Sequence, residues 1–252
     1  MRYFDALIEA HRVGVVSDHV HLGLGSAPTL DEAQEAMAER HLTALALIDG
    51  QVVVDVGCGF GGALRRIDAR FRRMHLVGVN IDCRQIDIAS QGAWCNPVDW
   101  RLCDAANFAE ERSFADRLLS LEAMFHFPDP AGFLSAAARA LKPGGIMVGS
   151  TILLGSAGPS RRVVCDGFAP WPHPDLTLDE LIAIAERAGL AVRAVEDLSP
   201  DCIPAFSFMC PPCPANLTDD PVTELKRLFQ TGAASYPMLV LERDQAGGKT
   251  QK

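Results

Sequence analysis

An apolar strand that runs directly into a glycine-rich turn is the feature that most constrains this chain. Residues 52–62 read VVVDVGCGFGG, in which a β-branched run ends in an acid and four glycines follow within six residues. The valines have the pattern of a buried parallel strand, and the apolar residues from Ala63 onward follow a helical spacing. We therefore expect a strand–turn–helix unit in which residues without a Cβ let backbone amides approach a ligand.

The glycine spacing alone leaves the ligand open, because Gly57, Gly59 and Gly62 also satisfy the dinucleotide pattern GxGxxG. With Asp55 in front, however, the stretch reads DxGxGxG and resembles motif I of class I S-adenosylmethionine (SAM)-dependent methyltransferases. Four later segments resemble the second to fifth strands of that family in the same order: HLVGVNID at 75–82, DWRLCDAANF at 99–108, SFADRLLSLEAMFHF at 113–127 and LKPGGIMVGST at 141–151. This order favours a methyltransferase over a nicotinamide enzyme.

Strands alternate with helices along the chain, which predicts an α/β fold. The resemblance, which spans about residues 19–244, implies a doubly wound, mostly parallel seven-stranded sheet with a reversed last strand, in a Rossmann-like methyltransferase fold with an N-terminal helical lid. We expect a single methyltransferase domain over residues 1–252. Within it, 1–47 would form N-terminal helices and the cofactor lid, 52–152 the SAM-binding core, and 153–252 substrate-side insertions and the last strands.

Local signals give most of the element boundaries. Thr29 and Thr177 each precede a helical pattern with Glu three residues later, which predicts two capping boxes. Residues 142–145 read KPGG, which predicts a turn that ends a helix, with a strand following at 146–152. Residues 155–176 show no clear periodicity.

The composition excludes some partners. The chain has 32 Asp and Glu against 23 Lys and Arg, a net charge of −9, and no dense basic run, so a nucleic-acid substrate is not expected. No apolar run reaches the ~18 residues of a membrane span. The N-terminal residues MRYFDALIEAHR lack the apolar stretch of a signal peptide, so we expect a cytoplasmic protein.

The eight cysteines are scattered, and Cys210 and Cys213 form the one suggestive pair. No second CxxC or HxxxH accompanies them, so we expect free thiols and no metal site. The sequence does not fix the oligomeric state.

The resemblance implies roles for the residues of motif I. Asp55 and the backbone of Gly57, Gly59 and Gly61 would hold the methionine end of SAM. The alternative is a turn whose glycines serve only the close packing of the following helix.

The resemblance also implies roles at the ends of the next three strands. The family usually places an acid at the end of the second strand to bind the ribose, whereas this chain has Asn80 there. Gln85 matches a position that also faces the cofactor in one branch of the family. That branch contains sugar O-methyltransferases and tocopherol-type C-methyltransferases. Asp104 would accept from the adenine amino group and Ala105 would supply a backbone amide, while Leu121 would lie near the transferable methyl group. Asn80 and Gln85 could instead be surface amides, and Asp104 could close an Asx turn.

His126 is the best candidate for a general base, because it matches a His-bearing loop of the O-methyltransferase branch and imidazole is a common proton acceptor. The alternative is a structural histidine. Glu122 is the next candidate. Ser150 stands where that branch carries an Asp, which weakens a His/Asp dyad, and His19 and His21 fall in a segment that resembles the cofactor lid.

Substrate contacts are expected from Tyr3, Phe4 and the regions 155–173 and 200–232. Five aromatic residues in and near these regions could wall an apolar pocket or belong to the core: Phe168, Trp171, Phe206, Phe208 and Phe229.

The sequence thus predicts an enzyme that transfers a methyl group from SAM to a small-molecule metabolite, with an oxygen or carbon acceptor and specialised metabolism as one setting. The alternative is a catalytically inactive subunit or regulator that binds SAM or another nucleoside.

Overall fold

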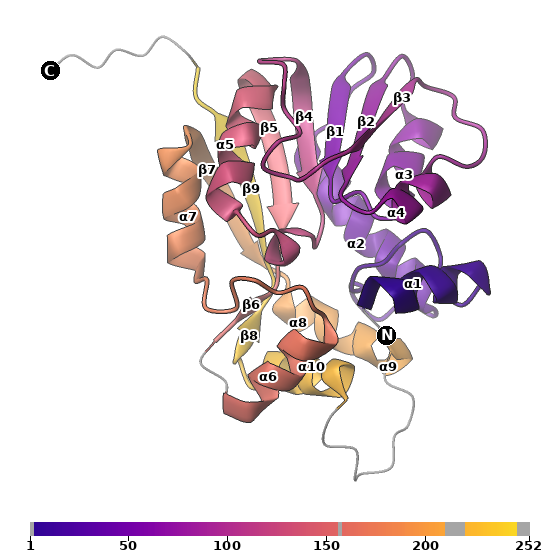
Figure 1. The fold of residues 1–252 in the computed structure, drawn as a ribbon, viewed down its shortest axis with the longest axis vertical. Helices are drawn as coiled ribbons and strands as arrows, with labels where there is room; N and C mark the ends of the chain where they lie inside the picture. The colour runs from indigo at the N-terminus through magenta and orange to yellow at the C-terminus, as the bar shows by residue number, and fades with distance from the viewer. Residues whose placement is uncertain (1–2, 156–157, 210–219, 246–252) are drawn as a thin grey trace, which may run out of the picture.

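The centre of the protein is a seven-stranded sheet with helices on both faces (Figure 1). The computed structural model describes residues 3–155, 158–209 and 220–245. The strand order is β3-β2-β1-β4-β5-β9-β7, and β9 runs antiparallel to both of its neighbours. The strands are β1 (Val52–Val56), β2 (His75–Asn80), β3 (Val98–Leu102), β4 (Ala115–Ser120), β5 (Leu141–Ser150), β7 (Leu190–Asp197) and β9 (Pro237–Arg243). The predicted doubly wound, mostly parallel architecture with a reversed last strand is confirmed.

Successive residues of the central strands face opposite layers of helices. Val53 of β1 packs in one core with Met37 and Ile67, whereas Val54 packs in a second core with Phe133. This alternation buries both faces of the sheet, as a parallel sheet requires. The helices that cover the sheet are α2 (Leu30–Leu45), α3 (Gly62–Arg70), α4 (Cys83–Ala89), α5 (Pro130–Ala140) and α7 (Leu178–Arg187).

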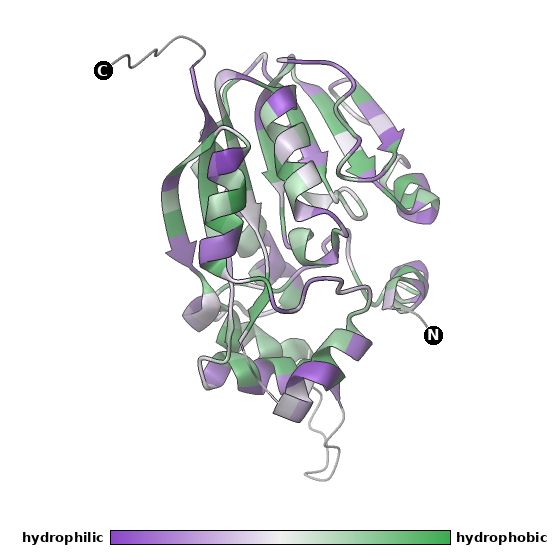
Figure 2. Cartoon of the chain, turned by 60° about the vertical axis from the view of Figure 1, so that its left-hand side comes forward, coloured by the Kyte–Doolittle hydropathy of each residue, from purple (hydrophilic) through white to green (hydrophobic). Residues whose placement is uncertain are grey.

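The hydropathy of the elements follows the same layering. The strands are mostly green in Figure 2, while single helices carry both green and purple residues. A helix of this mixed character can pack an apolar face on a sheet and turn a polar face to water. No helix in the described part of the chain combines the length and the apolarity needed to cross a membrane.

The two predicted capping boxes differ in the structure. At α7, the Thr177 hydroxyl accepts from the Glu180 amide, and the Glu180 carboxylate accepts from the Thr177 amide, so the box is complete. At α2, the structure gives only the first of these bonds, from the Glu32 amide to Thr29.

A layer of short elements lies beyond the end of the sheet toward which β5 points (Figure 1). Helix α1 (Tyr3–Arg12) lies at the same end, and α6 packs against α10. The other elements of this layer are α6 (Gly158–Gly167), α8 (Ser199–Cys202), η2 (Ile203–Ala205), α9 (Phe206–Met209), α10 (Pro221–Gln230) and the ribbon of β6 (Leu153–Leu154) with β8 (Ala234–Ser235). The carboxyl ends of the parallel strands therefore face a cap rather than open water.

Two local predictions differ from the structure. The region without clear periodicity contains the helix α6, in which Val164 is the buried residue. Residues 142–145 are part of β5 rather than a turn before it, since β5 begins at Leu141. Gly144 does adopt a turn-like φ of +75°, and the pairing with β4 shifts register between Ala115 and Arg117.

Candidate active site

A cavity of about 300 Å³ opens at the carboxyl edge of the parallel strands. It lies where ligands of open α/β sheets bind, between the strand ends and the cap. Of the predicted site residues, all but Gly61 line it: Asp55, Gly57, Gly59, Asn80, Gln85, Asp104, Ala105, Leu121 and His126. The end of the sheet thus brings together residues that are far apart in the sequence.

Asp55 is a buried acid with no hydrogen bond or ion pair to any residue that the structure describes. Its exposed fraction is 3%, and burial raises the pKa of its carboxyl to about 7. A buried carboxyl without a partner is unfavourable, so a cation or N–H donor in the cavity would stabilise it. The expected ammonium end of SAM fits this requirement.

The glycines of the turn divide into two kinds. Gly57 and Gly59 have φ of +81° and +55°, and a Cβ would lie 2.3 Å from the Ala123 Cβ at the first and 2.9 Å from the Val20 Cγ2 at the second. The cavity wall therefore leaves no room for a side chain at either position. Gly61 begins α3 with φ of +86°, and a Cβ there would face Ala89 at 3.2 Å, so Gly61 lies at a contact with α4 instead.

Asn80 and Gln85 are joined to each other and buried. The Asn80 Nδ2 donates to the Gln85 Oε1 at 3.0 Å, while the Asn80 Oδ1 accepts from the Asp82 amide at 3.0 Å. These bonds leave the Gln85 amide nitrogen with no recorded protein acceptor among the described residues. Both amides line the cavity, which is compatible with binding a ribose hydroxyl.

Asp104 forms an Asx turn and also lines the cavity. One carboxylate oxygen accepts from the Ala106 amide at 2.8 Å, which is an Asx turn. The structure records no hydrogen bond to the second oxygen, so the turn and the expected adenine contact are compatible. Ala105 is buried beside it at the cavity wall.

His126 presents one ring nitrogen to a carbonyl group. Its Nδ1 lies 2.6 Å from the Pro170 oxygen and must donate, because a carbonyl only accepts. The neutral ring then carries a lone pair on Nε2. The ring is enclosed by Phe4 and Phe125, with ring centroids 5.1 and 3.9 Å away, and burial lowers its pKa to about 4.

The low pKa bears on how His126 could act as a base. An exposed imidazole titrates near neutrality. Burial instead keeps the ring neutral and able to accept a proton throughout the physiological range.

His19 and His21 also line the cavity, and their protons can be placed from their partners. His21 Nδ1 donates to the Leu22 oxygen at 2.8 Å, so its Nε2 accepts from His19 Nδ1 at 3.2 Å. Burial lowers the pKa of His21 to about 3, which keeps the pair uncharged. The segment is attached to the core, since Gln34 donates to the His21 oxygen at 2.6 Å.

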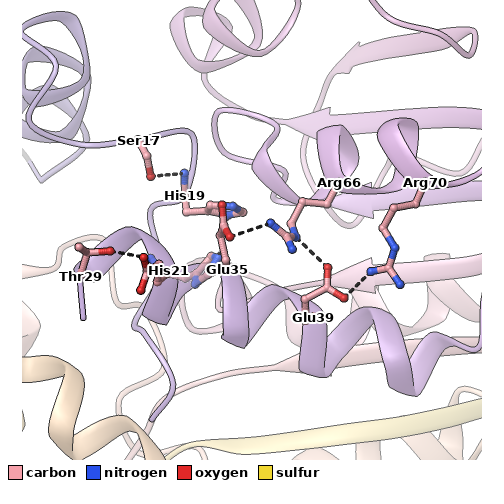
Figure 3. A network of polar contacts seen from close by, with 9 residues as sticks. Ser17, His19, His21, Thr29, Glu35, Glu39, Arg66 and Arg70 are labelled. Atoms are coloured by element: carbon pink, nitrogen blue, oxygen red, sulfur yellow. Dashed lines mark hydrogen bonds and ion pairs between the residues drawn. The ribbon is translucent and has the colours of Figure 1, made fainter. Parts of the chain in front are cut away.

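A charged network links the helix α2 to α3 beside His19 (Figure 3). Arg66 pairs with Glu35 at 3.2 Å and with Glu39 at 2.8 Å, and Arg70 pairs with Glu39. These side chains are partly exposed, so each pair contributes little alone. Together they connect α2 to the helix that follows the glycine turn.

Glu122 lies at the cavity wall with an unusual backbone conformation. Its φ is +52°, a value that few residues other than glycine adopt. Its carboxyl accepts from the Leu22 amide at 2.8 Å, its own amide donates to the Ser150 Oγ at 3.1 Å, and burial raises the pKa of the carboxyl to about 8. Strained residues that are held by several contacts are frequent at functional sites.

Part of the cavity lining is aromatic and apolar. It consists of Tyr3 and Phe4 of α1, whose rings contact His126, of Phe125 and Phe127, and of two prolines of the segment before α7. No Lys or Arg is among the described residues that line the cavity.

The aromatic residues expected from the variable regions have other positions. Trp171 packs on Phe125 at 4.4 Å but does not itself line the cavity. Phe168, Phe206 and Phe229 belong to the core, and Phe208 is 40% exposed.

The cysteine expectations are tested only in part. The described cysteines, Cys58, Cys83, Cys95, Cys103, Cys165 and Cys202, are all free thiols. Cys210 and Cys213 lie outside the described residues. Within the described ranges, no group of three His, Cys, Asp or Glu side chains could hold a metal ion.

Sequence reasoning missed a buried polar row beside Glu122, in which the Ser150 Oγ accepts from the Glu122 amide and contacts His41 and Tyr236. His41 comes from α2, Ser150 from β5 and Tyr236 from the position before β9, and all three are fully buried. No spacing in the sequence links them, because only the sheet topology places them together. Ser150 was noted only as a departure from the expected Asp.

Comparison with known proteins agrees with the site. A family model described as a methyltransferase domain matches residues 54–149. The methyltransferase GfsG of Streptomyces halstedii is 29% identical over 228 residues, which cover 83% of this chain and 81% of that protein. The 27-O-demethylrifamycin SV methyltransferase of Amycolatopsis mediterranei is 30% identical over 190 residues, which cover 71% and 68% of the two chains.

The fold has a solved counterpart. A putative sarcosine dimethylglycine methyltransferase from Galdieria sulphuraria superposes with a TM-score of 0.76 at 18% identity, over 94% of this chain and 97% of that one. The nicotinamide alternative has no support in these comparisons. The glycine turn, the strand-end residues and the relatives agree, and the chain belongs to the class I SAM-dependent methyltransferases, with SAM as its cofactor.

Proposed function

We propose that the protein methylates a hydroxyl group of a small, uncharged and largely apolar metabolite. The observation that carries this proposal is the composition of the cavity lining. We call its strand-end residues the polar wall and its aromatic side chains the aromatic wall, and no Lys or Arg is among the described residues of either. A phosphorylated or carboxylated acceptor would find no cation there, since such groups are usually bound by Arg or Lys.

The residues of the polar wall would hold the cofactor. Asp55 would accept a hydrogen bond from the ammonium group of SAM. The backbone at Gly57 and Gly59 would approach SAM closely, and the contact of Gly61 with α4 would help to shape the turn. The remaining members of this wall would bind the nucleoside and border the methyl group: Asn80, Gln85, Asp104, Ala105 and Leu121. When bound, SAM supplies a methyl group activated by its positively charged sulfur.

His126 is proposed as the general base. Because Nδ1 donates to Pro170, Nε2 is the atom that can accept the proton of an acceptor hydroxyl. As the hydroxyl oxygen forms its bond to the methyl carbon, its proton would pass to Nε2, and the carbon–sulfur electron pair would stay on sulfur. A ring that is neutral at physiological pH is ready for this step, although its low pKa makes it a weak base.

Relatives and bulk properties support the substrate class. The relative from Amycolatopsis mediterranei is named for a substrate demethylated at an oxygen, which supports an oxygen acceptor. The net charge of −9 disfavours nucleic acid as a partner. The free thiols among the described cysteines support a cytoplasmic location. We also propose that 1–47, 52–152 and 153–252 form one domain.

The proposal is tested by supplying SAM and a panel of acceptors and detecting methylated products by mass spectrometry. The panel pairs apolar phenols and secondary alcohols with their phosphorylated counterparts. Methylation of the neutral members alone supports the proposal, and methylation of the phosphorylated members overturns the substrate class. SAM binding without product from a broad metabolite extract would favour an inactive subunit instead.

A further inference from the structure

The segment 19–22 lies directly against the glycine turn. His19 and Val20 line the cavity. A Cβ at Gly59 would lie 2.9 Å from the Val20 Cγ2, and a Cβ at Gly62 would lie 2.6 Å from the His19 Nδ1. These distances leave no space between the segment and the turn. A displacement of the segment would therefore change the part of the cavity in which the methionine end of SAM is proposed to bind.

Leu22 attaches this segment to the strand ends. Its side chain is buried in the core, and its amide donates to the Glu122 Oε2 at 2.8 Å. The structure records no other acceptor for this amide among the described residues. On its other side, the segment is held to α2 by the bond from Gln34 to the His21 oxygen, at 2.6 Å. A buried amide that loses its acceptor is unfavourable, so this part of the segment depends on Glu122.

Glu122 reaches Leu22 from a constrained backbone. Its φ of +52° lies in the left-handed region, which few residues with a Cβ adopt. The Glu122 amide donates to the Ser150 Oγ at 3.1 Å, so the residue is held both by its amide and by its carboxyl oxygen. Such a conformation persists when the surrounding contacts over-determine it.

The Ser150 hydroxyl has no capacity for a further partner. Besides the Glu122 amide, its Oγ contacts His41 Nε2 at 2.8 Å and the Tyr236 hydroxyl at 3.1 Å. A hydroxyl has one proton and two lone pairs, so three partners use all of them. Ser150, His41 and Tyr236 are each 0% exposed, and together they form a buried row that fixes the oxygen to which Glu122 is bound.

We propose that Glu122 is a positioning residue: through the Leu22 amide it holds the segment 19–22 against the glycine turn, in the position that binds the cofactor. This inference rests on the proposed binding of SAM at this site. The role requires an acceptor oxygen at the reach of a Glu side chain, and no proton is transferred. It therefore differs from the role of a general base, which must gain a proton.

Two variants separate the reach of this side chain from its charge. Glu122→Gln keeps the length and an acceptor oxygen but removes the charge, whereas Glu122→Asp keeps the carboxyl group and shortens the side chain by one methylene. Asp is also more frequent than Glu in the left-handed region, so Glu122→Asp adds no backbone strain. In calorimetric titrations, Glu122→Asp should weaken SAM binding about 5- to 30-fold, and Glu122→Gln less than about threefold.

S-adenosylhomocysteine (SAH) shows whether charge contributes to these effects, because its sulfur is neutral. Positioning of the segment should affect SAM and SAH by the same factor. Attraction between a carboxylate and the sulfonium would affect SAM alone. We therefore expect Glu122→Asp to weaken the binding of both ligands equally. In the presence of an acceptor that the wild type methylates, this variant should raise the KM for SAM by more than it lowers kcat.

Hydrogen exchange of the Leu22 amide, followed by NMR, reports on the bond itself. In Glu122→Asp this amide should exchange about tenfold faster than in the wild type, while the amides of β1 keep their rates. In Glu122→Gln the exchange of the Leu22 amide should remain close to the wild-type rate. Faster exchange throughout β1 would mean that the whole protein is destabilised and would overturn the local role.

Ser150→Ala tests whether the buried row sets the position of Glu122. It removes the acceptor of the Glu122 amide, so the affinities for SAM and SAH should both decrease about 3- to 10-fold. Ser120→Ala is a matched control, because the Ser120 hydroxyl is equally buried and has no hydrogen-bond partner among the described residues. It should bind both ligands as the wild type does.

The outcomes separate this inference from the proposed function. Wild-type affinity of Glu122→Asp for SAM would show that reach is unimportant and would overturn the role of Glu122. A loss in Glu122→Gln that is confined to SAM would assign Glu122 a charge effect instead, and a 10²–10⁴-fold decrease in the kcat of Glu122→Gln at saturating SAM would make it a base. Wild-type affinity of Ser150→Ala would overturn the role of the row. Absence of SAM binding to the wild type would instead contradict the proposed site.

Discussion

At the scale of single residues, burial determines what the ionisable groups of this site can do. Asp55, Glu122 and His126 all line the cavity, and burial moves the pKa of each toward the uncharged form. Burial thus favours the uncharged form of these three groups, whereas bonds to Arg84 lower the pKa of Asp82 in the same lining. A cationic ligand would favour the ionised form of the buried acids.

His126 gives the most direct prediction for turnover. If it accepts the proton of a hydroxyl acceptor, His126→Ala should decrease turnover about 10²–10⁴-fold and leave SAM affinity nearly unchanged. Because its pKa is about 4, the wild type should retain activity as the pH falls to about 5, and turnover should decline only near pH 4 as the ring gains a proton. Steady-state kinetics across pH measure both effects. A decrease of less than about fivefold would point to catalysis by proximity or to another base.

Glu122 gives a prediction for stability. Its pKa is about 8 in the folded protein against 4.5 as the reference value, so the folded state binds the proton more tightly. The resulting stabilisation is complete below pH 4.5 and is lost as the pH rises through 8. Without ligand, Glu122→Gln should therefore be more stable than the wild type at pH 8.5, by about 1–3 kcal/mol, and this gain should vanish at pH 4.5.

Denaturant unfolding at the two pH values measures this difference. Glu186→Gln is the control, because it removes an exposed carboxylate of α7 far from the cavity. If the gain of Glu122→Gln is the same at both pH values, Glu122 is not the group that titrates.

At the scale of elements, the turn between β1 and α3 was predictable because its signal is local. Four glycines follow an apolar strand, and the positive φ values of Gly57, Gly59 and Gly61 explain why. The helix α6 and the start of β5 were not predictable in the same way. Tertiary contacts stabilise α6, and the sheet keeps residues 142–145 in β5 despite their turn-like sequence.

The turn carries its own prediction. Gly59→Val would place a side chain against Val20 at the cavity wall and should weaken SAM binding by more than about tenfold, or ~1.4 kcal/mol. Gly189→Val is a matched control, since Gly189 also has a positive φ, +84°, but no atom lies within 4 Å of its Cβ position. It should lose stability through backbone strain and retain SAM affinity. Calorimetry on the folded variants would contradict the site if Gly59→Val bound SAM normally.

At the scale of the whole molecule, the sequence predicted the sheet and the polar wall of the cavity better than the aromatic wall. The polar wall consists of strand ends whose order along the chain follows the family pattern. The aromatic wall combines α1 with the loops after β4 and α6. The buried row of His41, Ser150 and Tyr236 combines α2, β5 and the position before β9. Such long-range contacts have no sequence period, so they require the structure.

The overall charge leads to a prediction about partners. With a net charge of −9 and no Lys or Arg among the described residues of the cavity wall, the protein should not bind RNA or DNA at physiological salt. Mobility-shift or fluorescence-anisotropy titrations with short duplexes and single strands measure this. Tight binding that weakens steeply with salt would contradict the proposed substrate class.

The reversed strand β9 has a consequence for how the protein is completed during synthesis. β9 lies between β5 and β7, so β7 has no other strand to pair with, although it is translated first. Because β9 runs against its neighbours, its beginning lies at the edge where β4 and β5 end, and this brings Tyr236 beside Ser150. A nascent chain that has not yet reached residue 236 therefore lacks both the strand that joins β5 to β7 and the tyrosine that contacts Ser150. Ribosome-bound chains of increasing length should acquire cofactor binding only after this last segment has emerged.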